Sequence, residues 1–170
     1  MEKHFDQELD GLKGEILKMG ALVEAAIFES VESLKQLDEA RARKVIANDK
    51  IVDNLENDIN EICVDLLALY QPMAKDLRFI TMVLKITKDL ERMADLGVDI
   101  AQRVLELVGK PLLKPLVDIP ALANVAKQMT KEVLDAFVNK DANRAKRVIQ
   151  LENEADRLRN LVQKELLEDY

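Results

Sequence analysis

The sequence predicts an all-α protein made of two tandem three-helix-bundle repeats, the second of which lacks its last helix. Three observations lead to this fold class. Helix breakers are rare, with 5 Gly and 4 Pro among 170 residues, so the elements must be long. Apolar residues recur at helical spacing along most of the chain. The segment that begins at Asp38 recurs 103 residues later, which indicates an internal duplication.

Composition and charge narrow the function classes. Hydrophobic residues make up 48% of the chain and aromatic residues 4%, with no Trp, so the core must be aliphatic. The formal net charge of −7 argues against non-specific nucleic-acid binding, which needs Lys and Arg on the phosphates. The single Cys cannot form an internal disulfide, and no apolar run resembles a signal peptide or could span a bilayer. We therefore expect a folded cytoplasmic protein that binds no nucleic acid.

The first two helices are expected over residues 5–36 and from 39 to about 70. The apolar stripe of the first consists of Leu9, Leu12, Ile16, Met19, Val23, Ala26, Ile27, Val31 and Leu34. Asp38 is a good N-cap for the second, whose stripe consists of Val45, Val52, Ile59, Cys63, Leu66 and Tyr70. Pro72 ends this helix and is expected at the first position of the third, where its missing N–H costs nothing.

The third helix has the most regular pattern, with apolar residues at alternating steps of four and three, as in a bundle seam. These residues are Phe79, Val83, Ile86, Leu90, Met93, Gly97, Ile100, Val104 and Leu107. Gly109 and the prolines at 111, 115 and 120 then interrupt the pattern. The expected division is a first repeat over 1–109, a linker over 110–118 and a second repeat over 119–170.

The second repeat supplies a fourth helix, from about Ile119 to Asn139, and a fifth from Ala142 onward. The 103-residue offset pairs the second helix with the fifth, for example Arg41 with Arg144. No counterpart of the third helix follows. Either a sixth helix has been removed or comes from another chain, or the protein pairs with itself to cover the exposed face. The basic clusters at 41–44 and 144–147 are either solvated or dock an acidic partner.

Acidic pairs four residues apart are the candidate chemistry, because a helix places such pairs on one face. The pairs are Asp49 with Asp53 on the second helix and Glu91 with Asp95 on the third. If these helices form an antiparallel hairpin around Pro72, residues at one level have numbers that sum to about 144. Asp53 with Glu91 and Asp49 with Asp95 both meet this condition. The register predicts four carboxylates at one level, provided both pairs face each other.

Clustered carboxylates raise one another's pKa unless a cation neutralises them, so the pattern favours a hard metal ion. Oxygen ligands suit Mg²⁺, Mn²⁺, Ca²⁺ or iron rather than a structural zinc. The alternative is that Lys85, Lys88 and Arg92 neutralise the four acids as ordinary surface ion pairs. In that case the protein would be a helical scaffold that binds no metal.

The other polar residues offer little for catalysis. His4 is the only histidine, which argues against a di-iron oxidase with two Glu-x-x-His motifs, and it is a weak candidate ligand. Cys63 lies on the apolar stripe of the second helix and is expected in the core. With no phosphate loop either, we expect no enzyme; a carboxylate-bridged metal hydrolase or oxidase is the weakest alternative.

Three stretches of the first repeat resemble the PhoU family of phosphate-signalling proteins. They are residues 48–56 (NDKIVDNLE), 71–78 (QPMAKDLR) and 89–95 (DLERMAD), in the family's order and spacing. The resemblance covers the first repeat and continues in the second through Asp156. It implies two pseudo-symmetric three-helix bundles, usually in a homodimer, with multinuclear metal sites at E(D)xxxD motifs.

Carried over to this chain, the family's metal motifs fall on three acidic pairs. They are Asp49 and Asp53, Glu91 and Asp95, and Glu152 and Asp156. The implied cofactor is a divalent or trivalent metal, namely iron, manganese, magnesium or zinc. The family's fourth motif, on a sixth helix, has no counterpart here, and Asp99 stands where the family more often has an uncharged polar residue.

The function that the resemblance implies is regulation rather than catalysis. Proteins of this family damp phosphate uptake and the phosphate-starvation response from the cytoplasm. The implied partners are the ATPase of a phosphate-specific ABC transporter and a membrane-bound sensor histidine kinase. Association with the membrane is therefore expected only through these partners.

Overall fold

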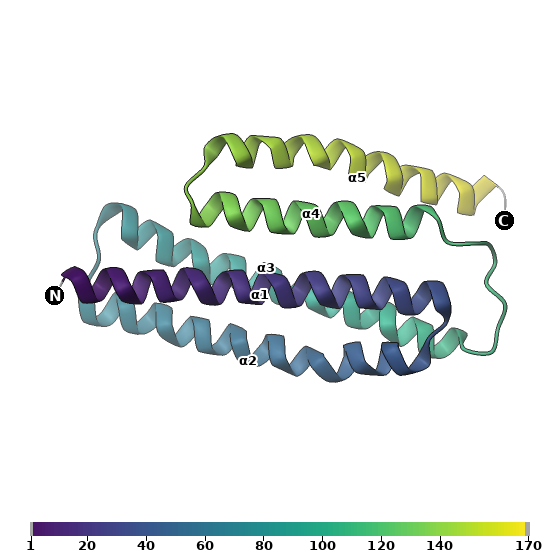
Figure 1. The fold of residues 1–170 in the computed structure, drawn as a ribbon, viewed down its shortest axis with the longest axis horizontal. Helices are drawn as coiled ribbons and strands as arrows, with labels where there is room; N and C mark the ends of the chain where they lie inside the picture. Colours follow the sequence, from purple (N-terminus) through teal and green to yellow (C-terminus); the bar gives the residue numbers. More distant parts are fainter. Residues whose placement is uncertain (1, 169–170) are drawn as a thin grey trace.

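A computed structural model describes residues 2–168 and shows five α-helices and no strands among them. The helices are α1 (Glu2–Gln36), α2 (Glu39–Tyr70), α3 (Ala74–Leu107), α4 (Asp118–Val138) and α5 (Ala142–Glu168) (Figure 1). The all-α fold class is confirmed. Asp169 and Tyr170 lie outside the described residues, as does any continuation towards a sixth helix.

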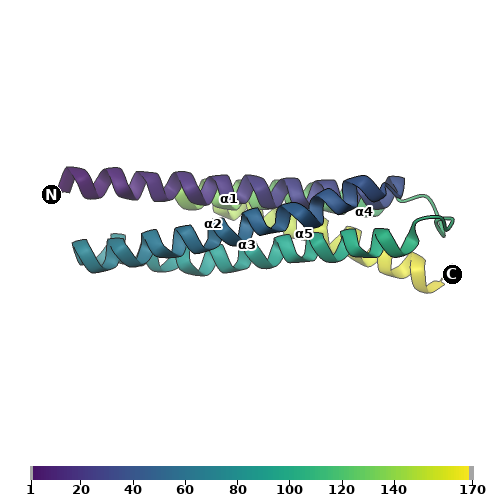
Figure 2. The same ribbon diagram turned by 90° about the horizontal axis from the view of Figure 1, so that it is seen from below.

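The first three helices form one bundle, and the last two extend it on one side. Each of α1, α2 and α3 packs against the other two. Helix α4 packs along α1, and α5 packs against α4 on the side away from α1 (Figure 1). The view from below shows all five helices running along one long axis, with the segment between α3 and α4 crossing at one end (Figure 2). The second repeat therefore consists of a helical hairpin that rests on the first through the contact of α1 with α4.

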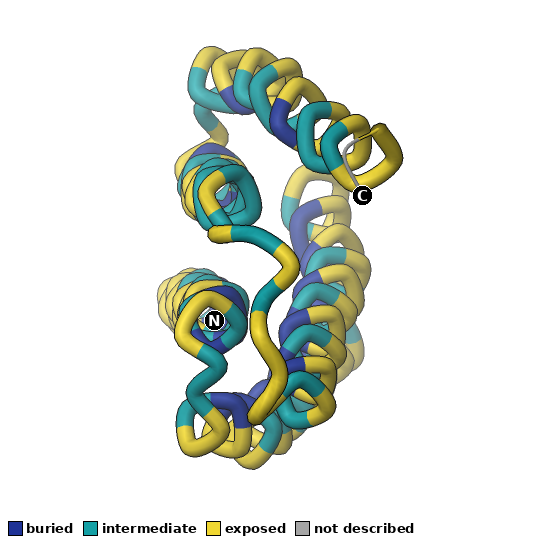
Figure 3. Tube along the Cα trace, turned by 90° about the vertical axis from the view of Figure 1, so that its right-hand side faces the viewer, coloured by how far each residue is buried: buried dark blue, intermediate teal, exposed yellow. Residues whose placement is uncertain are grey.

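The core lies between α1, α2 and α3, and it is aliphatic as expected. Its fully buried side chains include Leu12, Ile16 and Met19 of α1, Ile59 of α2 and Ile80 of α3. Figure 3, which looks along the helices, shows buried positions where these three helices face one another. In α5, by contrast, only Val148 and Leu158 are buried, because α4 is the only described helix that packs against it.

The structure repeats its local geometry at the 103-residue offset. Asp38 caps α2 by accepting a hydrogen bond from the backbone N–H three residues later, and Asp141 does the same at the start of α5. Arg41 pairs with a glutamate of α1, with Nε 3.2 Å from the carboxylate of Glu29. Arg144 pairs with Glu132, which stands 103 positions after Glu29. The duplication read from the sequence therefore includes the caps and the interhelical ion pairs.

Pro72 does not begin α3, contrary to the sequence-based expectation. Gln71 is the C-cap that follows α2 and is left-handed, with φ 46°. Helix α3 has Met73 as its N-cap and Ala74 as its first residue. Pro72 therefore lies between the two caps. The axes of packed helices lie about 8–10 Å apart, so the chain needs a few non-helical residues to cross from one to the other.

The buried stripe of α3 also differs from the expected one in its middle. Ile86, Met93 and Ile100 are only half-buried, whereas the neighbouring positions Thr87, Ala94 and Ala101 are buried. A straight α-helix drifts by about 20° per heptad relative to a strict seven-residue pattern, which brings the adjacent row inward. The small residues of that row allow close packing. The Thr87 hydroxyl is satisfied by donating to the backbone carbonyl of Val83.

Candidate metal site

The hairpin of α2 and α3 brings the four predicted carboxylates of the first repeat into electrostatic contact. We call Asp49, Asp53, Glu91 and Asp95 the α2/α3 acid cluster. Its register is marked by Lys88, whose Nζ lies 3.9 Å from the carboxylate of Glu56 across the hairpin. The numbers of these two residues also sum to 144. Residues of α2 and α3 whose numbers sum to 144 therefore lie at about the same level of the hairpin.

Two of the four acids, Asp49 and Asp95, have raised pKa values. Burial raises the pKa of Asp49, and the negative charges of Asp53, Asp95 and Glu91 raise it further. Burial likewise raises the pKa of Asp95, with further contributions from Glu91 and Asp53 and an opposing one from Lys88. Raised pKa values mean that the ionised cluster is electrostatically unfavourable as it stands. A bound cation would relieve this repulsion.

One oxygen of the cluster lacks a hydrogen-bond partner. Asp49 Oδ1 is buried and receives no hydrogen bond. A buried carboxylate oxygen without a donor is costly, and native proteins usually satisfy such an atom with a donor, a water molecule or an ion. An oxygen-only set of four carboxylates matches the preference of hard cations. The residues present therefore fit a metal ion in donor chemistry and in the unsatisfied atom.

The side chains do not converge on a single point. Among the described residues, no three His, Cys, Asp or Glu side chains are grouped closely enough to hold a metal ion in the conformations shown. Ion binding would require the carboxylates to turn towards one another.

The alternative to a metal was that Lys85, Lys88 and Arg92 neutralise the acids through ion pairs. In the described chain only Lys88 forms such a pair. Lys88 donates a 2.8 Å hydrogen bond to Glu91 and approaches Glu56. Lys85 and Arg92 form no ion pair within the described part of the chain. Glu56, which the sequence-based site did not include, is 16% exposed at its side chain. The residue numbers of Glu56 and Lys88 sum to 144, and this register could have identified Glu56 from the sequence.

The third predicted pair lies apart from the cluster. Glu152 and Asp156 are exposed on α5, which among the described helices packs only against α4. Asp156 pairs with Arg159 on its own helix, with 3.0 Å between the charged atoms. The structure therefore places four of the six predicted ligands on the hairpin of α2 and α3 and the other two on α5.

The remaining candidates behave as structural residues. Burial raises the pKa of the Cys63 thiol to about 11, so it stays protonated and inert at neutral pH. His4 lies near Glu8 on its own helix, with 3.7 Å between its Nε2 and the Glu8 carboxylate, and its side chain is largely exposed. Neither residue has the partners that a nucleophile or a general base requires.

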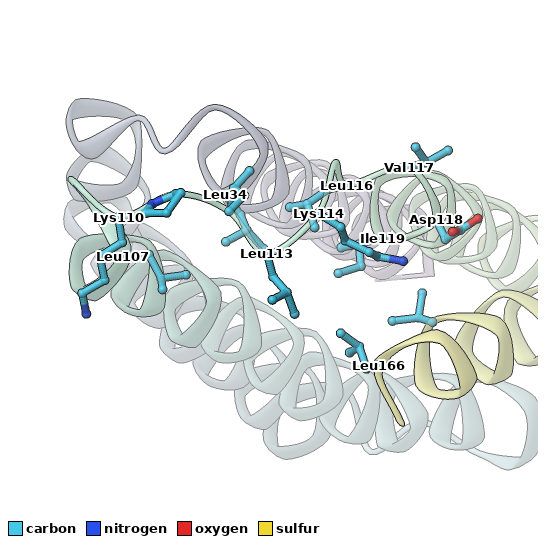
Figure 4. Close-up of a pocket in the computed structure, with 13 residues that line it drawn as sticks. Leu34, Leu107, Lys110, Leu113, Lys114, Leu116, Val117, Asp118, Ile119 and Leu166 are labelled. Atoms are coloured by element: carbon cyan, nitrogen blue, oxygen red, sulfur yellow. The ribbon is translucent and has the colours of Figure 1, made fainter. Parts of the chain in front are cut away.

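An apolar pocket of about 260 Å³ lies between the linker and the C-terminal part of α5. Figure 4 shows aliphatic side chains around it from α1, α3, the linker and α5. Val162 and Leu166, two of its lining residues, stand 103 positions after Ile59 and Cys63, which are fully buried in the first repeat. These two lining residues therefore correspond to core positions of the first repeat.

None of the helices in the described part of the chain combines the length and the apolar composition needed to cross a bilayer.

Comparison with known proteins places the chain in a family. The family model described as "PhoU domain" matches residues 16–104 and 119–170. A relative from Aquifex aeolicus, named phosphate-specific transport system accessory protein PhoU homolog, is 38% identical over 161 residues, which cover 95% of this chain and 73% of the relative.

Two crystal structures share the fold. PhoU from Pseudomonas aeruginosa aligns with a TM-score of 0.85 and 32% identity, over 97% of this chain and 82% of that one. The phosphate transport system regulatory protein PhoU from Streptococcus pneumoniae aligns with a TM-score of 0.87 and 29% identity, over 96% of this chain and 77% of that one. With two separate matches to the family model, one in each repeat, the chain belongs to the PhoU family.

Proposed function

We propose that this protein is a metal-binding helical adaptor that acts as an accessory and negative regulator of phosphate uptake and phosphate-starvation signalling. The observation that carries the metal part is the α2/α3 acid cluster, in which burial and the neighbouring carboxylates raise the pKa values of Asp49 and Asp95 and one buried oxygen of Asp49 has no hydrogen-bond donor. The names of its relatives support the phosphate-transport part.

The four cluster residues would hold the ion, which we expect to be iron, manganese, magnesium or zinc. The metal would supply positive charge and would tie α2 to α3 through shared ligands; no catalytic step is assigned to it. Glu152 and Asp156 would form half of a second site, which needs further ligands from outside the described helices.

The adaptor role rests on long helices with exposed faces and on the lack of catalytic groups in the described residues. The proposed partners are the ATPase of the phosphate ABC transporter and a sensor histidine kinase. The protein would work in the cytoplasm as a homodimer and would reach the membrane only through these partners. Exposed apolar residues on several helices, such as Leu69 of α2 and Leu96 of α3, offer surface for such contacts.

The metal part is tested by elemental mass spectrometry of the purified protein beside Glu91→Ala/Asp95→Ala. The matched control is Asp58→Ala/Glu61→Ala, which removes two exposed carboxylates of α2 that form no ion pair in the described chain. We expect stoichiometric metal in the wild type and the control, and its loss in the cluster variant. Equal metal content in all three would contradict the proposal and favour a scaffold without metal.

The adaptor part needs its own experiment. The immobilised protein should retain the transporter ATPase or the kinase from solutions of the purified partners. Retention of neither would reject the adaptor role and leave the metal result untouched, because the two readouts share no component.

A further inference from the structure

Lys88 lies at the edge of the α2/α3 acid cluster and connects its two helices. Its Nζ donates to Glu91 at 2.8 Å and lies 3.9 Å from Glu56 of α2. The two glutamate side chains are 17% and 16% exposed, whereas Lys88 itself is 66% exposed. The ammonium therefore reaches in from solvent to two carboxylates that are largely covered.

The charge of Lys88 acts on the cluster electrostatically. Its own pKa is raised by the hydrogen bond to Glu91 and by the charges of Glu56, Glu91 and Asp95. In return its positive charge partly offsets the rise in the pKa of Asp95. Of the three basic residues near the cluster on α3, only Lys88 forms an ion pair in the described chain. The net negative charge of the cluster is therefore partly offset by one residue.

We propose that Lys88 is a built-in counter-cation of the α2/α3 acid cluster that competes with a metal ion for the carboxylate of Glu91. This inference rests on the metal binding proposed above. The hydrogen bond from Lys88 occupies one oxygen of Glu91, and an ammonium held there repels an incoming metal cation. Lys88 thus weakens metal binding and raises the concentration of free metal at which the site fills.

The displacement is physically easy. An exposed ion pair contributes little free energy, because water solvates the separated charges well. The side chain can therefore swing into solvent when a multivalent ion, which draws several carboxylate oxygens at once, enters the cluster. Lys88 is thus a competitor of the metal rather than a fixed block.

The test is a titration with Mn²⁺, in which the electron paramagnetic resonance signal of the free ion reports binding. Four proteins are compared: wild type, Lys88→Met, Lys88→Arg and Lys85→Met. Lys85 lies on the same helix and is exposed, but it has no ion pair in the described chain, so Lys85→Met controls for the change in net charge. We expect Lys88→Met to bind Mn²⁺ roughly threefold to tenfold more tightly than Lys85→Met, and Lys88→Arg to resemble the wild type.

Thermal unfolding of the same proteins is a second readout, because it can be measured both without metal and with the site filled by Mn²⁺. Without metal, Lys88→Met should unfold at a lower temperature than Lys85→Met, and saturating Mn²⁺ should remove this difference. Affinity for Mn²⁺ in Lys88→Met that is equal to or weaker than in Lys85→Met overturns the inference while the metal site stands. If neither the wild type nor Lys88→Met binds Mn²⁺, the metal site and the inference fail together.

Discussion

Leu37 and Lys140, which stand 103 positions apart, both adopt the left-handed backbone conformation, with φ of 51° and 55°. Each residue immediately precedes the aspartate that caps the next helix. A left-handed residue is the usual means of ending one helix so that the chain can turn back, and glycine fits it best because it has no Cβ. The duplication has therefore kept the turn geometry in both repeats without keeping a glycine at either turn.

The first prediction follows from that strain. Lys140 is exposed and forms no ion pair in the described chain, so Lys140→Gly should raise the free energy of unfolding by about 1 kcal/mol. Lys140→Ala is the matched control and should change stability little, because its Cβ meets the same backbone. Urea denaturation measures both. Destabilisation by Lys140→Gly would show that the left-handed turn is not a source of strain.

The acid cluster predicts that metal-free Asp49→Asn is more stable than the wild type. The substitution removes the negative charge of Asp49, whose ionised form is disfavoured because burial and the charges of Asp53, Asp95 and Glu91 raise its pKa. The same variant should bind metal more weakly, because it loses a carboxylate. Thermal unfolding in chelator and titration with Mn²⁺ check the two effects. A metal-free variant less stable than the wild type would mean that the Asp49 carboxylate stabilises the fold.

The pH dependence of stability gives a further prediction about the cluster. Because folding raises the pKa values of Asp49 and Asp95, the native state binds more protons than the unfolded state near these pKa values. Their contribution to stability therefore falls as pH rises through the folded pKa and is recovered as pH is lowered. Asp141 and Glu132, whose pKa values are lowered by hydrogen bonds that they accept, contribute in the opposite direction.

The difference between variants isolates the cluster. The stability gained by Asp49→Asn/Asp95→Asn over the wild type should be largest at neutral pH and should shrink as pH falls below the ordinary range for carboxyls. Urea midpoints measured in chelator from pH 4 to pH 8 provide the check. A gain that stays constant with pH would exclude these two groups as the origin.

The sequence predicted those parts of the molecule that depend on period and register. Asp53 and Glu91 lie at one level because a hairpin with a short turn fixes the pairing of two long helices. Thr87, in contrast, is buried although it is polar, and its place in the core could not be read from an apolar pattern. The ion pair of Lys88 could not be predicted either, because the three nearby basic residues were equivalent in sequence and only side-chain geometry separates them.

The interhelical arginines give a prediction that uses one repeat as the control for the other. Arg144 contacts both Glu132 and Asp135, at 2.6 and 2.7 Å, whereas Arg41 lies 3.2 Å from Glu29 and 3.8 Å from Asp38. Arg144→Met should therefore lower the urea midpoint more than Arg41→Met. High salt should reduce the difference, because these pairs are partly exposed. Equal effects at low salt would contradict the stronger pairing of Arg144.

The contact between the two repeats depends on a glycine of α1. A Cβ at Gly20 would overlap the side chain of Leu134, which is 4% exposed in the interface of α1 with α4. Gly11 and Gly14 of the same helix have open space around them, so alanine there should stabilise by about 0.5–1 kcal/mol through helix propensity. Gly20→Ala gains the same propensity but forces Leu134 to move, and overpacking of this kind costs about 1–3 kcal/mol.

We therefore expect Gly20→Ala to destabilise the protein while Gly11→Ala and Gly14→Ala stabilise it. A double-mutant cycle with Leu134→Ala locates the cause. Leu134→Ala alone should cost about 2–5 kcal/mol, and less when Gly20 is already alanine, because the new methyl group then occupies part of the space vacated by the leucine. Additive effects would place the cost of Gly20→Ala elsewhere in α1. Non-additive effects would identify Gly20 and Leu134 as the pair that sets how closely the second repeat packs on the first.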